Sequence, residues 1–224
     1  MARPPYSQVS RALRAIEESR DAGWPLPGSP YESLLHAEMT AQRITHLGGL
    51  PGVLMDMDFV MERQRRAHMP PAQAQRNNRL HTARQIISAD RMARGELQQG
   101  AIVSTDVAMP VFEVTPDRTA PQLQKLVDAA DAGWDIKAVR PLHLVDALGP
   151  NTYSLILIGD PAAPEAVYWE AADQTVEPHE SWRTDIAATA GAAAAHGQLS
   201  SDALTADITA DMFRRMHEFF APAA

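Results

Sequence analysis

The chain has 224 residues, of which 45% are hydrophobic and 21% are charged, and its formal net charge is −8. This composition is typical of a globular protein with a sizeable core and differs from that of a disordered chain. Cysteine is absent, which excludes disulfides, zinc–thiolate sites, iron–sulfur clusters and thiol catalysis.

The charge is distributed unevenly along the chain. Residues 1–100 carry 13 arginines and 10 acidic residues, for a net charge of +3, whereas residues 101–224 carry 7 basic and 18 acidic residues, for a net charge of −11. The chain has only two lysines, Lys125 and Lys137. We therefore do not expect catalysis by a lysine side chain. Such a preference for arginine is typical of a GC-rich bacterial or phage genome.

The first part of the chain predicts helices. Apolar side chains recur there at helical spacing, and proline or glycine separates the periodic segments. The expected helices cover residues 8–21, 31–47, 53–66 and 72–97. Gly23 is expected to cap the first helix, and Gly95 or Gly100 the last.

The pattern changes close to residue 98. Short runs rich in β-branched residues predict strands at 101–103 and 107–114, and the strongest strand signal, at 153–158, pairs with 167–169 as a hairpin. Helices are expected at 120–132 and 202–220. The alanine-rich segment 187–198 fits either a closely packed helix or a mobile segment. We therefore expect an α+β fold, in which a helical N-terminal half precedes a mixed region with a small β-sheet and a C-terminal helix.

The same change suggests a division of the chain into two parts. Residues 1–98 form a helical part that is arginine-rich between 59 and 94, and residues 99–224 form an acidic α+β part, although one continuous domain also fits. The tetrapeptide Asp-Ala-Gly-Trp occurs at 21–24 and again at 131–134. Either a duplication or two independent helix ends of the same type would explain the repeat.

The chain lacks the sequence motifs of several large enzyme classes. It contains no G-x-x-x-x-G-K-[ST], G-x-G-x-x-G, G-x-S-x-G or H-E-x-x-H motif, so the usual signals of P-loop, dinucleotide-binding, α/β-hydrolase and zincin sites are missing. We expect no cofactor and lean towards a protein that is not an enzyme. The apolar runs are too short for a transmembrane helix, and the N-terminus does not resemble a signal peptide, so we expect a cytoplasmic protein.

Three functions remain after these exclusions. The first is a protein-interaction module, of the adaptor or toxin-neutralising type, whose acidic half binds a basic partner protein. The second is nucleic-acid binding through the basic segment 63–94, in which arginines and amide side chains would contact phosphates and base edges. The arginines expected to bind are Arg63, Arg66, Arg76, Arg79, Arg84 and Arg91.

The third function is that of a metal-dependent hydrolase that uses histidines and carboxylates. Glu32 and His36 are its weak candidate ligands, because residues four apart share one face of a helix. Partner identity and oligomeric state stay open at this stage.

Overall fold

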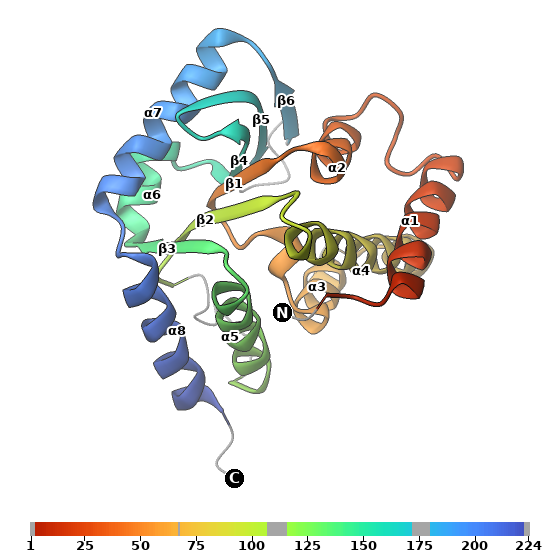
Figure 1. The fold of residues 1–224 in the computed structure, drawn as a ribbon, viewed down its shortest axis with the longest axis horizontal. Helices are drawn as coiled ribbons and strands as arrows, with labels where there is room; N and C mark the ends of the chain where they lie inside the picture. Colours follow the sequence, from red (N-terminus) through yellow and green to blue (C-terminus); the bar gives the residue numbers. More distant parts are fainter. Residues whose placement is uncertain (1–2, 67, 107–115, 172–179, 222–224) are drawn as a thin grey trace.

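The computed structural model describes residues 3–66, 68–106, 116–171 and 180–221. Within these ranges, helices surround one six-stranded mixed sheet (Figure 1). The helices are α1 (Tyr6–Asp21), α2 (Pro30–Thr40), η1 (Gly52–Leu54), α3 (Met57–Arg66), α4 (Pro71–Ala93), α5 (Pro116–Asp131), α6 (Pro141–Leu148), α7 (Ile186–Asp202) and α8 (Ala206–Phe220). The strands are β1 (Arg43–Gly48), β2 (Gln98–Ser104), β3 (Asp135–Val139), β4 (Thr152–Asp160), β5 (Ala163–Ala171) and β6 (Glu180–Arg183). The expected α+β class is confirmed.

The sheet has the strand order β3-β2-β1-β4-β5-β6. β1, β2 and β3 run parallel to one another, whereas β4 pairs antiparallel with β1 and continues into the antiparallel strands β5 and β6. β1 lies in the N-terminal part of the sequence and pairs with two strands that follow residue 97. The expected division at residue 98 therefore passes through one continuous sheet.

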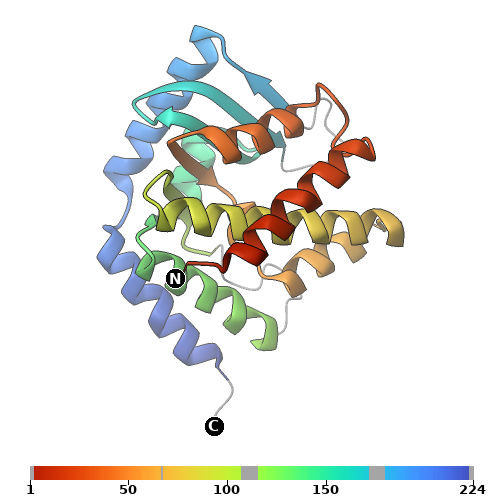
Figure 2. The same cartoon turned by 45° about the vertical axis from the view of Figure 1, so that its right-hand side comes forward.

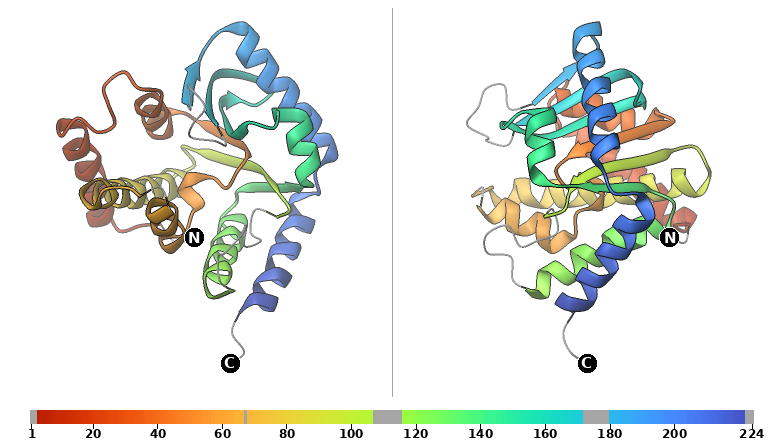
Figure 3. Two further views of the ribbon diagram at one scale, coloured as in Figure 1. Left: turned by 180° about the vertical axis from the view of Figure 1, so that it is seen from behind. Right: turned by 90° about the vertical axis from the view of Figure 1, so that its left-hand side faces the viewer.

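Helices cover both faces of this sheet. Side chains alternate between the faces along β1, so that Leu47 points to one side and Ile44 to the other. On the Leu47 side, Leu199 of α7 completes a buried cluster, against which α6 also packs. On the opposite side lie α2, α4 and α5 (Figures 1 and 3).

Two helix pairs extend this architecture beyond the sheet. α1 packs across α4 through an apolar cluster that includes Ile16, Leu80 and Ile87. α8 packs along α5, where Phe213 is fully buried. Figure 2 shows α1 crossing α4 in front of the sheet and the α5–α8 pair at the lower end of the molecule.

Hydrogen bonds with Leu204, just after α7, and with α8 cover the outer edge of β3. The Leu204 amide donates a hydrogen bond to the Ala138 carbonyl at 2.9 Å. The Ala138 amide in turn donates to the Thr209 hydroxyl of α8 at 3.1 Å. These contacts satisfy edge groups that could otherwise pair with another strand.

The prediction of a helix over residues 31–47 was wrong for the second half of that segment. The helix ends at Thr40, and residues Arg43–Gly48 form the central strand β1. Ile44 and Leu47 fit a helical spacing, but each is fully buried within the sheet. Pairing with β2 and β4 satisfies the backbone of this segment on both sides, so the tertiary partners override its local pattern.

The other expected elements agree with the structure in type, with shifts at their ends. The helix expected at 53–66 is divided into η1 and α3, and α4 ends at Ala93 with Gly95 after it. The strands at 101–103 and 153–158 and the hairpin with 167–169 are confirmed. Segment 187–198 lies within α7. The strand expected at 107–114 lies outside the described residues.

The repeated Asp-Ala-Gly-Trp tetrapeptide ends a helix in the same way at both places. Gly23 and Gly133 have positive φ angles of 73° and 93°. At both ends the glycine amide donates to a carbonyl three residues back, and the tryptophan amide to one five residues back. This is the Schellman motif, which requires a left-handed residue and so favours glycine. The motif explains the repeat without a duplication.

None of the helices in the described ranges has both the length and the apolar character that a membrane crossing requires.

Candidate functional site

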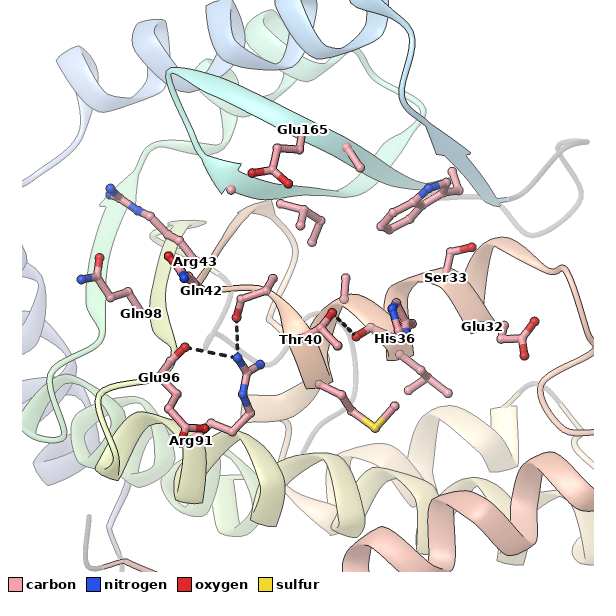
Figure 4. Close-up of a pocket in the computed structure, with 18 of the residues that line it drawn as sticks. Glu32, Ser33, His36, Thr40, Gln42, Arg43, Arg91, Glu96, Gln98 and Glu165 are labelled. Atoms are coloured by element: carbon pink, nitrogen blue, oxygen red, sulfur yellow. Dashed lines mark hydrogen bonds between the residues drawn. The ribbon is translucent and has the colours of Figure 1, made fainter.

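An open cleft of about 1630 Å³ lies beside α2 (Figure 4). One wall is α2, the base is formed by the segments that enter β1 and β2, and the opposite wall is formed by the β4–β5 turn and β6. Its lining is mixed: apolar side chains such as Leu35, Ile158 and Trp182 alternate with polar and charged ones such as Arg43 and Glu165. Both kinds of group are therefore available to a ligand.

A buried ion pair holds α2 in this position. Arg84, in the middle of α4, donates two hydrogen bonds to the carboxylate of Glu38 on α2, one of them at 2.6 Å. It also donates to the Tyr31 hydroxyl at 2.8 Å, and its guanidinium lies over the Tyr31 ring. The Arg84 and Glu38 side chains are only 10% and 9% exposed, so the attraction between them acts in a poorly solvated environment.

Electrostatics keep Arg84 protonated. Burial is the largest single effect and would lower the pKa of Arg84, but the attraction and hydrogen bonding of Glu38, together with the nearby tyrosines, outweigh it and raise that pKa. Burial raises the pKa of Tyr31. It also raises that of Tyr168 on β5, whose hydroxyl donates to Glu180 at 2.8 Å. A charged pair with neutral tyrosines beside it therefore connects α4, α2 and the sheet.

A second arginine of α4 holds the end of α2. Arg91 donates hydrogen bonds of 2.6 Å to the carbonyls of Glu38 and Ala41, and one of 3.2 Å to that of Glu96 (Figure 4). The last carbonyls of a helix have no partner within it and carry the negative end of its dipole. Arg91 therefore caps α2 and connects it to the segment that enters β2.

The charged groups of the cleft fall into two sets. Arg91 is committed to the carbonyls above, and Glu32 accepts hydrogen bonds from the Gly28 amide at 2.6 Å and from Arg20 at 3.4 Å. Arg43 and Glu165, in contrast, have no side-chain partner among the described residues, and both lie at the cleft (Figure 4). Groups without an internal partner can bind a ligand without first losing an interaction.

The structure separates the six arginines expected to bind nucleic acid. Arg84 and Arg91 are held by the partners described above, whereas Arg76 and Arg79 are exposed on α4. Arg79 lines a smaller hollow of about 690 Å³ between α1 and α4, together with Arg11 of α1. Arg63 and Arg66 belong to α3, and their side chains lie outside the described part of the structure.

Within the described part of the chain, the structure adds no third ligand to Glu32 and His36, the residues expected to bind a metal. Glu32 is bound by Gly28 and Arg20, and His36 is exposed on the cleft side of α2. Across the described residues, no group of three or more His, Asp or Glu side chains is placed to hold a metal ion.

Sequence reasoning missed the structural role of Arg84 and Arg91, although a signal was present. Leu80, Arg84, Ile87 and Arg91 follow one another at spacings of four, three and four residues, which places them on one helical face. Leu80 and Ile87 are apolar and are both buried. Arginines on the same stripe therefore indicate buried partners more than a nucleic-acid contact.

No family model, curated protein or solved structure matches this chain.

Two histidines of the core, His46 and His81, are buried. His46 of β1 is 1% exposed, and its Nε2 contacts the Gln99 side-chain oxygen at 3.3 Å, while its Nδ1 has no partner. His81 of α4 contacts the Met55 carbonyl at 3.1 Å. Burial is the main cause that lowers the pKa of each to about 4, so both are neutral in the folded protein.

Because these two histidines are buried in the neutral form, we expect the folded protein to lose stability in mild acid. In the unfolded chain a histidine has a pKa near 6.5 and binds a proton below that pH, whereas His46 and His81 resist protonation until about pH 4. Stability is therefore fully present above pH 6.5 and falls as the pH drops towards 4. Between pH 7 and pH 5, each histidine should lower the free energy of unfolding by about 2 kcal/mol.

Urea unfolding at the two pH values measures this loss. His46→Gln should reduce the pH dependence by about half, and the exposed His36→Gln variant is the matched control. A pH dependence that is unchanged in His46→Gln would contradict the assignment.

Proposed function

We propose that the protein is a cytoplasmic protein-interaction module whose cleft beside α2 receives a basic segment of a partner protein. The observation that carries the proposal is the open cleft, whose lining combines apolar side chains with charged groups that have no internal partner among the described residues. Its volume of about 1630 Å³ exceeds the range of about 300–1,000 Å³ typical of small-molecule pockets. An extended segment with alternating apolar and charged side chains would match the size and chemistry of the cleft.

The preference for a basic segment follows from which charges are available. Among the described residues of the acidic half of the chain, Asp160 and Glu165 are the charged ones that line the cleft. Asp160 accepts a turn hydrogen bond from the Ala162 amide through one carboxylate oxygen, which leaves its other oxygen available. Of the three arginines that the described residues contribute to the cleft, Arg20 and Arg91 already have partners in this chain, whereas Arg43 is available. The available groups are therefore two acidic side chains and one basic side chain, which favours a segment with a net positive charge. Complementary charge of this kind increases association rates and specificity.

Selection of displayed random peptides on the folded protein tests this proposal. The selected peptides should combine lysine or arginine with an apolar anchor, and their affinity should fall as salt is added. Glu165→Arg should weaken their binding by about tenfold or more, because it places a like charge in the cleft. Asp146→Arg, an exposed substitution on α6 with the same change in charge, should have a much smaller effect.

Two results would refute the cleft as the binding site. One is a selection in which no peptide is enriched above the background of an unrelated folded protein. The other is a set of peptides that binds Glu165→Arg as tightly as the original protein.

A second candidate function is supported by the hollow between α1 and α4. It places two arginines, Arg11 and Arg79, among the amide side chains Gln8, Gln75 and Asn78. Arg76 lies exposed three residues before Arg79 on the same helix. Arginines contact phosphates, and amides contact base edges, so we propose nucleic-acid binding at this hollow as the alternative.

Fluorescence anisotropy with labelled DNA and RNA tests the alternative. Binding should weaken steeply between 50 and 200 mM salt, with a slope set by the number of phosphates contacted. Substitution of Arg11, Arg76 and Arg79 by alanine should abolish it, whereas Arg140→Ala, at the exposed residue just before α6, is the control. Binding that does not change with salt, or that survives the triple substitution, would rule out this surface.

A further inference from the structure

Two large apolar side chains on the outer face of α8 are exposed to solvent. Phe219 is 82% exposed and Ile208 is 54% exposed. They are separated by 11 residues, or three helical turns, so they lie on one line along the helix. Figures 1 and 2 both place α8 at the outer edge of the molecule, with α5 on its inner side.

An ion pair lies between these two side chains on the exposed surface. Arg215 donates to Asp211 at 2.9 Å, and their side chains are 78% and 55% exposed. Along the helix the order is therefore apolar, acidic, basic, apolar. We call Ile208, Asp211, Arg215 and Phe219 the α8 stripe.

The order of residues in the α8 stripe makes it complementary to itself when one copy is reversed. If two α8 helices pack antiparallel around a twofold axis near residue 213, Ile208 of each copy lies opposite Phe219 of the other. The same arrangement brings Asp211 of each copy next to Arg215 of the other. Such matching of one patch with itself is what a twofold symmetric dimer requires.

We infer that α8 is a self-association surface, through which two copies of this chain form a twofold symmetric dimer. The apolar ends would bury Phe219 and Ile208, and the central charges would set the antiparallel register. A contact made mainly by one helix from each copy is smaller than the ~1,200 Å² of a stable interface. The dimer should therefore be weak and reversible.

Sedimentation of the full chain over a concentration series tests the inference. The average mass should rise towards that of a dimer as the concentration increases. Phe219→Asp should keep the protein monomeric over the same range, because it places a charge where the apolar contact forms. Leu142→Asp, at an exposed apolar position on α6, is the matched control and should leave the association unchanged.

Charge reversal tests the register independently of the apolar contact. Asp211→Arg alone and Arg215→Asp alone should each weaken self-association, because like charges would then face each other across the axis. An equimolar mixture of these two variants should form a mixed dimer, in which opposite charges meet again. The double variant Asp211→Arg/Arg215→Asp should recover the self-association of the original protein.

Three results would overturn the inference. The first is a protein that stays monomeric at every concentration. The second is a dimer that persists in Phe219→Asp, which would place the interface elsewhere. The third is a mixture of the two charge variants that associates no better than either one alone. Circular dichroism of each variant shows whether it has folded.

Discussion

The position of α2 on the sheet depends on two arginines that project from α4 towards α2. Arg84 holds the carboxylate of Glu38, and Arg91 holds the carbonyl of the same residue together with that of Ala41. They are seven residues apart and so lie on the same side of α4. Removing one partner of a buried pair costs about 3–5 kcal/mol, because a charge is left buried without its counterion. The position of α2, and with it one wall of the cleft, is therefore fixed by polar contacts as well as by apolar packing.

This constraint explains why the two faces of the sheet differ. On the α7 face, an apolar cluster around Leu47 and Leu157 closes the interior, with both side chains fully buried. On the other face, α2 lies over the sheet but leaves an open space beside it. On this face the two arginines add polar contacts to the apolar cluster that holds α2 on the sheet. The cleft that is available to a partner therefore lies beside α2, the helix that the buried ion pair holds in place.

Local patterns predicted much of the fold but not the site. Helical periodicity was sufficient for α1, α4, α5 and α8, and the apolar run of β4 predicted the hairpin with β5. β1 was missed, because the alternation of Ile44 and His46 is short and Leu47 also fits a helix. The Glu38–Arg84 contact joins residues 46 positions apart, and no local pattern specifies such a pair. The cleft, formed by five separate segments, could be found only after the chain was folded.

Hydrogen exchange along α2 tests most directly whether the arginines of α4 position this helix. In Arg84→Met, the amides of residues 31–40 should exchange about 100-fold faster, which corresponds to the lower end of the expected cost. Replacing both partners, as Glu38→Met/Arg84→Met, should restore part of the protection, because no unpaired charge remains. Arg94→Met is the matched control, since Arg94 pairs with Asp90 and Glu96 near the surface and should leave α2 unchanged. Protection of α2 that is the same in Arg84→Met as in the original protein would contradict the account.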